Sequence, residues 1–509
     1  MTAARPTFSI VTPVYETPLD VLAEMVHSVT SQSYGSWQLV LVDDRSPSES
    51  VRDYLRAAAA AEPRITVVLR ETNGGISAAS NDAIAAATGE FTVLVDHDDL
   101  LVDGALEKVA AVLAAHPLVD YLYTDEDKID GDGRLYEEFR KPDWSPERLR
   151  SQMYCGHLSV LRTSIVRDVG GFDSGVDGSQ DHDLVLKVTE RARQVYHLPE
   201  VLYHWRALAD STASSGDAKP YAWDAGVRAV QAHVDRLGLD TEVRHGVWFG
   251  TYALYRRLDE QVLVSVILAG DGSVDGIGRT VRSLAASTTH ARVEYIVVSA
   301  FDRAELEREL GQAAHVTIVE CGHAAGFSER CNQGFLASAG EVVVLVDDGL
   351  DVVAGDVITD LAACLAEPDV GLVGAQVFDH EGLVYGAGHN YANRQFGHAL
   401  LHFTPGDPGP FSALMIDREV SGLDTECVAL RRETYIAVGG LSESLPPKLS
   451  DVDLSFKTRM LGLRLVWVSR VHLAHRAPPE RAPAARRAAL DLVRARWASS
   501  SPDRPSFDV

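Results

Sequence analysis

The stretch Phe91-Thr-Val-Leu-Val-Asp96-His-Asp-Asp99 decides the fold class of this chain. Its first five residues are mostly apolar and β-branched, which predicts a strand buried on both faces of a parallel sheet. Side chains alternate along an extended backbone, so Asp96 and Asp98 are expected to point the same way. Two carboxylates about 6 Å apart repel by roughly 3 kcal/mol at an effective dielectric of 20, and a divalent cation would reverse that repulsion. The alternative is that the acidic residues simply end the strand and meet water.

Composition limits the classes of protein that need to be considered. A chain of 509 residues predicts two or three domains, and 46% hydrophobic with 24% charged residues is typical of a folded protein. The formal charge of −26 argues against a nucleic-acid partner. Five scattered cysteines without a C-x-x-C pair, and an N-terminus that leaves no room for a signal peptide, favour a cytoplasmic protein. The sequence contains no run of about 18 apolar residues, so no membrane-spanning helix is expected. Peripheral contact with the inner face of the membrane stays open.

Strands and helices alternate through the first part of the chain, which predicts an α/β fold with a mostly parallel sheet. The expected strands cover residues 8–14, 37–43, 65–69 and 91–95. Ligands of such sheets bind beyond the carboxyl ends of the strands. The residues that fall there, and that one crevice could therefore gather, are Tyr15, Asp43, Asp44, Asp96 and Asp98.

The second half of the chain repeats the first. Residues Gly326, Asn332, Gly340 and Asp347 match Gly75, Asn81, Gly89 and Asp96 at one constant offset. This repeat predicts two tandem copies of one α/β domain. The expected boundaries are 1–219 for the first copy, 220–261 for a helical and β-like linker, 262–478 for the second copy, and 479–509 for a C-terminal helix and tail.

An ordered set of motifs carries a resemblance to a known family. The motifs are Thr12-Pro-Val-Tyr-Glu16, Val42-Asp-Asp44, Asn73-Gly-Gly75, Val95-Asp-His-Asp-Asp99, Gly170-Gly-Phe172, Gly178-Ser-Gln-Asp-His-Asp183 and Tyr203-His-Trp-Arg206. Together they resemble the family 2 glycosyltransferases of the GT-A fold, which implies two tandem GT-A domains. The run from Thr124-Asp-Glu-Asp-Lys128 to Tyr203-His-Trp-Arg206 is similar to a subgroup that builds bacterial surface polysaccharides, including O-antigen and rhamnose-containing glycans.

The resemblance implies a role for each matching residue. Pro13, Tyr15 and Glu16 would border the nucleotide base, and Asp43 or Asp44 would accept a hydrogen bond from a uracil or thymine N–H. Asp96 and Asp98 would hold Mn²⁺ or Mg²⁺ against the donor diphosphate, which suits hard oxygen ligands. The remaining roles implied are a third metal ligand for His204, a diphosphate contact for Arg206 and the catalytic base for Asp181.

Each of these roles has a simpler alternative. Asp181 could be a helix N-cap, His204 a packed side chain, and Arg206 a member of a surface ion pair. Gln180 stands where many family members carry an acid. The run Asp125-Glu-Asp127 is expected to be mostly solvated, and His157 is expected to be structural.

The second copy departs from the motifs. The pair Asp43-Asp44 is replaced by Ser299-Ala300, and the second acid of the metal motif is replaced by Gly349. We therefore expect an inverting, metal-dependent glycosyltransferase whose first copy moves a sugar from a UDP- or dTDP-sugar to a glycan or lipid-linked acceptor. The alternatives are two working active centres, or a non-catalytic protein that binds glycans or protein partners. Assembly into a homo-oligomer stays open.

Overall fold

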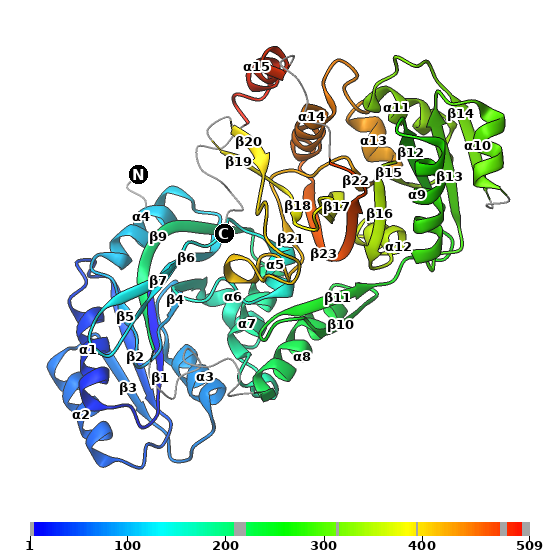
Figure 1. Ribbon diagram of the computed structural model, residues 1–509. Coiled ribbons are helices and arrows are strands. Elements are labelled where there is room, and N and C mark those ends of the chain that lie inside the picture. The colour runs from blue at the N-terminus through cyan, green and yellow to red at the C-terminus, as the bar shows by residue number, and fades with distance from the viewer. Residues whose placement is uncertain (1–4, 208–219, 312–314, 393–394, 479–485, 501–509) are drawn as a thin grey trace. The chain divides into compact units, whose positions relative to one another are not determined.

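The computed structural model describes residues 5–207, 220–311, 315–392, 395–478 and 486–500 (Figure 1). The chain divides into two compact units. Unit 1 comprises residues 1–144, 152–239 and 243–252, and unit 2 comprises residues 145–151, 240–242 and 253–509. The chain therefore passes between the units several times before residue 253.

Unit 1 is built on a mixed sheet that contains the strands expected from the sequence. Its strands lie in the order β3-β2-β1-β4-β8-β6-β9-β5, with β7 beside β6. The strands β1 to β4 are parallel, and β8 runs antiparallel to β4. The bounds are β1 Phe8–Val14, β2 Trp37–Asp43, β3 Ile65–Leu69, β4 Phe91–Leu94, β5 Leu100–Leu101, β6 Val119–Ile129, β7 Leu135–Phe139, β8 Ser159–Arg162 and β9 Gln194–Arg206.

The helices of unit 1 bury apolar faces against this sheet. In α1 the buried residues include Leu22, Met25, Val26 and Val29, which recur at the spacing of one helix face. They join Ile10 and Leu39 of the strands in one core. The helices are α1 Leu19–Thr30, α2 Glu49–Ala61, α3 Ile76–Ala86, α4 Ala105–Ala115, α6 Thr163–Asp168, α7 Gln180–Thr189 and α8 Pro220–Arg236, with a 3₁₀ turn at Ser174–Val176.

Unit 2 repeats the strand order of unit 1. Its strands follow the order β14-β13-β12-β15-β22-β17-β23-β16, with β18 beside β17 as β7 is beside β6. The tandem α/β architecture expected from the sequence is therefore confirmed. The bounds are β12 Val264–Gly270, β13 Val293–Ser299, β14 Val316–Glu320, β15 Val342–Asp347, β16 Leu350–Ala354, β17 Val370–Phe378, β18 Val384–Gly386, β21 Arg418–Glu419, β22 Cys427–Arg431 and β23 Arg464–His475.

The remaining elements of unit 2 cover this sheet or lie beside it. Two short strands, β19 His389–Ala392 and β20 Gln395–His398, form a separate hairpin. The helices are α5 Pro146–Ser151, α9 Val274–Ser287, α10 Arg303–Leu310, α11 Phe327–Ala337, α12 Val357–Cys364, α13 Arg432–Ala437, α14 Pro447–Met460 and α15 Arg486–Arg496, with a 3₁₀ turn at Pro410–Ser412. A separate two-stranded sheet lies between the two large sheets in the sequence. It consists of β10 Thr241–His245 and β11 Tyr252–Arg256.

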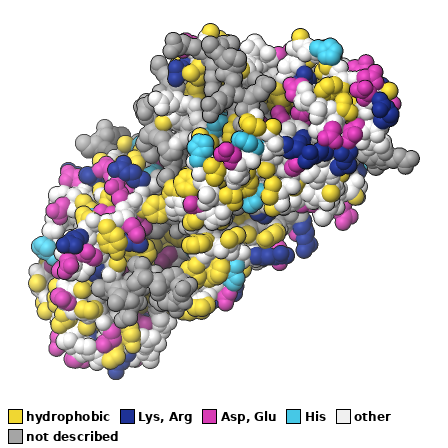
Figure 2. Space-filling model, viewed as in Figure 1, with side chains coloured by type: hydrophobic (Ala, Val, Ile, Leu, Met, Phe, Trp, Pro, Cys, Tyr) yellow, Lys and Arg dark blue, Asp and Glu magenta, His cyan; other side chains and the backbone are white. Residues whose placement is uncertain are grey.

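The strand that opens the sequence argument ends earlier than expected. Strand β4 stops at Leu94, and His97 and Asp98 form a turn rather than extended backbone. The expectation of extended backbone through Asp98 is therefore wrong, because the chain turns there to enter β5. On the face of the molecule in Figure 2, acidic side chains are scattered over the surface, with basic side chains among them.

Candidate active site

Asp96 lies at the carboxyl end of β4, next to a histidine that the sequence did not single out as functional. The Nε2 atom of His157 lies 3.7 Å from Oδ2 of Asp96. Asp96, Asp99 and His157 each offer one ligand atom, and these three atoms lie within 4.8 Å of one another. The ring of His157 stacks on Tyr203 at 4.5 Å, which fixes its orientation toward Asp96. Two carboxylates and an imidazole are a donor set that fits Mn²⁺, and also Mg²⁺ through the oxygens.

Asp99 is buried and organises the chain around the metal motif. Its Oδ2 accepts a hydrogen bond of 2.5 Å from the hydroxyl of Tyr203, and its Oδ1 accepts one of 2.7 Å from the backbone N–H of Arg206. Burial, and then the charge of Asp96, raises the pKa of Asp99 well above its ordinary value. Burial also raises the pKa of Asp98, and the negative charge of Asp96 raises it further. The site therefore concentrates negative charge that a cation would neutralise.

Arg206 is committed to the polypeptide in this structure. Its Nε donates to the carbonyl oxygen of Asp98 at 2.7 Å, and its second guanidinium nitrogen pairs with Glu24 at 2.6 Å. These contacts hold the turn that carries Asp98. The predicted contact between Arg206 and a diphosphate stays a prediction, and it would require the ion pair to Glu24 to open.

Asp181 lies in the first turn of α7 and is half-buried. Burial, and then the charge of Asp96, raises the pKa of Asp181 to about 6, while His157 acts in the opposite direction. Burial alone would lower the pKa of His157, but Asp96, Asp99, Glu126 and Asp181 raise it. Asp181 therefore interacts electrostatically with both Asp96 and His157.

His204 is paired with a different carboxylate from the one expected. Its Nδ1 contacts Oδ1 of Asp127, which lies opposite it in the parallel pair of β6 and β9. The described residues that gather around Asp96 as candidate ligands are Asp99 and His157. This group includes neither Asp98 nor His204, so the roles of these two residues as metal ligands stay predictions.

The acidic run on β6 is buried, contrary to expectation. Asp125 is 4% exposed and Asp127 is 8% exposed. Each acid has its own partner, because Nε2 of His197 lies 2.8 Å from Asp125 and Nζ of Lys141 lies 2.8 Å from Glu126. A sequence pattern could not reveal these partners, since they come from other elements.

The two predicted base-binding carboxylates differ in their surroundings. Asp44 accepts hydrogen bonds from the backbone N–H groups of Gly74 and Gly75, at 2.9 and 2.8 Å, and an ion pair from Arg70. Gly75 has φ of +85°, so this loop depends on a residue without a side chain. Asp43 accepts from the N–H of Ser46 at 3.1 Å and faces Nε of Arg52 at 3.3 Å.

The other predicted base-binding residues lie beside this pair. Pro13 pairs with Val42 in register between β1 and β2, and Tyr15 follows directly with 47% of its surface exposed. Glu16 accepts from the N–H of Ser48 at 2.8 Å, which ties the loop after β1 to the loop after β2. An exposed ring beside buried carboxylates is a suitable border for a nucleobase.

The matching positions of unit 2 are occupied by internal contacts. Asp348 turns inward and accepts from the N–H groups of Asp271 and Gly272, at 3.1 and 3.0 Å. Asp347 accepts from the N–H of Gly349 at 2.8 Å. In the repeat, Asp451 matches Asp181 and His475 matches His204 at nearly one offset. Asp451 accepts from the hydroxyl of Thr425, and His475 faces Glu426 at 3.0 Å.

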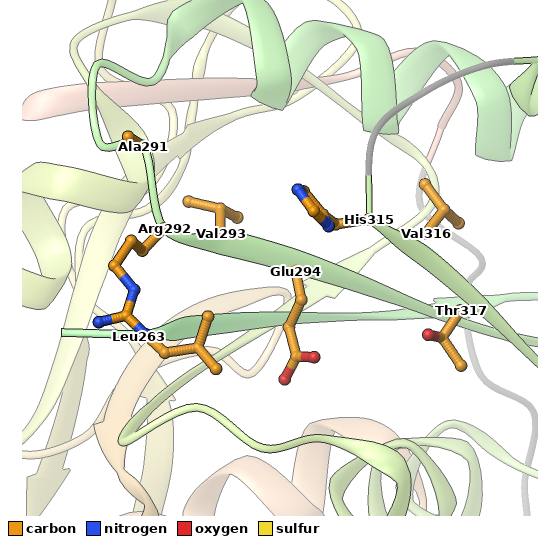
Figure 3. Close-up of a pocket in the computed structure, with 8 residues that line it drawn as sticks. All are labelled: Leu263, Ala291, Arg292, Val293, Glu294, His315, Val316 and Thr317. Atoms are coloured by element: carbon orange, nitrogen blue, oxygen red, sulfur yellow. The ribbon is translucent and has the colours of Figure 1, made fainter. Parts of the chain in front are cut away.

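A cavity of about 410 Å³ lies at the amino ends of β13 and β14 in unit 2 (Figure 3). In Figure 3, Glu294 and Thr317 point to one side of these strands, and Val293 and Val316 point to the other. The carboxyl end of β15, with Asp347, is at the opposite edge of the sheet. The cavity is therefore separate from the position that matches the site of unit 1.

Within the described residues, the structure has no helix that is both long enough and apolar enough to span a membrane. The family model for glycosyl transferase family 2 matches residues 9–170, and the model for glycosyltransferase like family 2 matches residues 261–500.

Three curated relatives illustrate the similarity. The uncharacterized protein y4gI of Sinorhizobium fredii is 36% identical over 99% of this chain and 57% of its own length. The O-antigen biosynthesis protein RfbC of Myxococcus xanthus is 33% identical over 92% of this chain and 37% of its own length. The chain thus spans only part of these two relatives. The putative teichuronic acid biosynthesis glycosyltransferase TuaG of Bacillus subtilis is 37% identical over 42% of this chain and 84% of its own length.

Two family models in tandem agree with the repeated strand order, and TuaG matches over most of its length. The chain therefore belongs to glycosyltransferase family 2 and has two tandem units of the GT-A fold.

Proposed function

We propose that unit 1 transfers a sugar from a UDP- or dTDP-sugar to a glycan or lipid-linked acceptor, with inversion and with a divalent metal ion. The observation that carries this proposal is the convergence of Asp96, Asp99 and His157 beyond the carboxyl end of β4. The charges of Asp96 and His157 also act on the carboxyl group of Asp181. The names of RfbC and TuaG support a role in bacterial surface polysaccharide synthesis.

Mn²⁺ or Mg²⁺ would be held by Asp96 and Asp98, and His157 offers a nitrogen ligand beside Asp96. A bound cation would stabilise the negative charge that develops on the leaving diphosphate. Tyr203 and Arg206 keep this ligand group in place, because they bond Asp99 and the carbonyl oxygen of Asp98.

Asp181 would act as the catalytic base. A sugar hydroxyl is a poor nucleophile until a group within hydrogen-bond reach takes its proton, and such a base contributes about 10²–10⁴-fold. The raised pKa of Asp181, about 6, keeps the carboxylate ionised at neutral pH while it remains basic enough to accept the proton. Attack by the acceptor oxygen from the face opposite the leaving group would invert the anomeric centre.

The nucleobase of the nucleotide-sugar donor would lie against Tyr15 and Pro13. Both oxygens of Asp44 accept hydrogen bonds from backbone N–H groups, whereas Oδ2 of Asp43 makes no hydrogen bond within the described residues. Asp43 is therefore the better of the two candidate acceptors for a uracil or thymine N–H. Asp44 would then shape the loop that borders the nucleotide.

Unit 2 would not catalyse transfer by the same route. Asp347 bonds its own loop, Asp348 bonds the loop that follows β12, and Gly349 replaces the second acid of the metal motif. We propose that this unit supports unit 1 or binds the growing glycan. An enzyme with two working centres is the alternative, since Asp451 and His475 are retained.

The test compares matched substitutions in the two units of the full chain. Transfer from UDP- and dTDP-sugars to a polysaccharide-derived acceptor is measured with Mn²⁺ for Asp96→Asn and for its counterpart Asp347→Asn. We expect loss of transfer only for Asp96→Asn. Full activity of Asp96→Asn would overturn the site, and loss of one product linkage in Asp347→Asn would favour two working centres.

A further inference from the structure

Unit 2 contains a second set of metal-ligating side chains, built differently from the set in unit 1. His389 begins β19 and His398 ends β20, and the two residues lie opposite each other in the hairpin (Figure 1). Asp424 lies in the loop between β21 and β22. The N–H of His389 donates to the carbonyl oxygen of Gly422 at 2.7 Å, which ties the hairpin to this loop.

The three side chains converge at distances that suit a metal ion. Nε2 of His389 lies 3.1 Å from Oδ1 of Asp424, and Nδ1 of His398 lies 3.3 Å from Oδ2 of Asp424. One ligand atom from each residue lies within 4.8 Å of the others. Tetrahedral ligands with bonds of about 2.1 Å are separated by roughly 3.4 Å, so a small shift would place these atoms around one cation.

The facing atoms lie at ion-pair distances but not in the geometry of aligned hydrogen bonds. Nδ1 of His398 and Oδ1 of Asp424 are buried, and neither makes an aligned hydrogen bond within the described residues. Asp424 is 8% exposed and His389 is 5% exposed, so both side chains are largely shielded from bulk solvent.

The neighbouring residues support the same arrangement. The hydroxyl of Tyr391 lies 2.9 Å from Nδ1 of His389, which orients the ring so that Nε2 faces Asp424. A side chain at Gly386 would come within 2.8 Å of Oδ2 of Asp424, so a glycine leaves room for the carboxylate.

We propose that His389, His398 and Asp424 bind one first-row transition-metal dication of the Zn²⁺ type, with a fourth position open. Two imidazoles and one carboxylate select such an ion over Mg²⁺, which prefers oxygen ligands. The ring of Tyr385 contacts both His398, at 5.2 Å, and His475, at 5.0 Å. The ion would thus lie beside the counterpart of His204 and would provide positive charge in the unit that has lost its second motif acid.

The experiment measures metal content and affinity, and it does not depend on the transferase activity. Full-length protein is stripped with EDTA, titrated with Zn²⁺ in excess Mg²⁺, and analysed for bound zinc after gel filtration. Wild type should hold one more equivalent of zinc than His389→Ala or His398→Gln, and the Kd for that equivalent should rise at least about 100-fold in both. Tyr391→Phe should raise this Kd about 10–100-fold through loss of its contact with His389.

Two controls separate this site from other binding. Asp96→Asn should retain the additional equivalent, because it alters only the site of unit 1, and the exposed His380→Ala should match wild type. Circular dichroism checks that each variant is folded, and His398→Gln, which retains a polar side chain, decides if His389→Ala unfolds. Equal zinc content in wild type and His398→Gln would overturn the proposal and leave Asp424 as a carboxylate between two imidazoles.

Discussion

At the scale of single residues, the proposed base Asp181 connects the charge of the candidate site with the proposed reaction. Its pKa is raised to about 6, and a base works only when deprotonated. We therefore expect kcat/KM to fall as the pH drops through about 6 and to level off above neutrality. Asp181→Asn should lower kcat by about 10²–10⁴-fold and leave the Kd of the donor nearly unchanged. Asp451→Asn is the matched control, and an Asp181→Asn variant with near-normal kcat would rule out this base.

His157 shows where reasoning from sequence stops at this scale. Family motifs indicated the acids Asp96 and Asp181, but the imidazole beside Asp96 comes from a segment about sixty residues away in the chain. The motif histidine, His204, instead pairs with Asp127. Which of two histidines meets a carboxylate depends on tertiary packing, and spacing along one sequence does not contain it.

Exchanging each histidine in turn tests this difference. His157→Gln should weaken Mn²⁺ binding by about 10–100-fold, since it alters a group beside Asp96, whereas His204→Gln should change it less. Titration of Mn²⁺ by electron paramagnetic resonance measures both. A larger loss for His204→Gln would restore the assignment implied by the family motif.

At the scale of elements, the alternation of strands and helices predicted the sheet, because each strand carries its own apolar pattern. The prediction from sequence was wrong at β6, where a run of acids was expected to be solvated. There Asp125, Glu126 and Asp127 are enclosed by the protein. A charged strand becomes stable inside a sheet only if neighbouring elements bring partners. Here β9 provides two histidines, and the segment after β7 provides Lys141.

Lys141 is the clearest test of that balance. Its ammonium group is fully buried and donates to Glu126 at 2.8 Å and to the carbonyl oxygen of Cys155 at 2.6 Å. Lys141→Met leaves Glu126 without its cation and should lower the free energy of unfolding by about 3–5 kcal/mol. Urea unfolding measures this, and the double variant Lys141→Met with Glu126→Gln should recover part of the loss. A single variant as stable as wild type would show that Glu126 does not need the ammonium group.

At the scale of the whole molecule, the repeat in sequence predicted two copies of one sheet, but not the path of the chain between them. Helix α5 follows β7 of unit 1 and yet belongs to unit 2. There Glu147 pairs with Arg256 at 2.6 Å, and Arg150 pairs with Glu367 at 2.7 Å. Ion pairs between residues over a hundred positions apart leave no local pattern to read.

This network gives a dependence of stability on pH. Burial alone would raise the pKa of Glu147, but Arg256, Arg150 and Arg464 lower it to about 2 from an ordinary 4.5. A depressed pKa contributes stability that is complete above about pH 4.5 and is lost as the pH falls toward 2. Glu147→Gln should therefore unfold at a lower temperature than wild type at neutral pH. This difference in melting temperature should become smaller as the pH is lowered. A difference that stays constant down to pH 3 would contradict this role for Glu147.

The passage of the chain between the units has a consequence for how such a protein can be divided or recombined. The chain changes unit after residues 144, 151, 239, 242 and 252. A single cut at any position consequently leaves at least one unit incomplete. A chimera that exchanged the first copy at the end of its last motif would carry α5 along and separate it from Glu367 and Arg256. Exchange of the proposed donor specificity between related chains should therefore need substitutions within unit 1, or joint transfer of residues 145–151 together with unit 2.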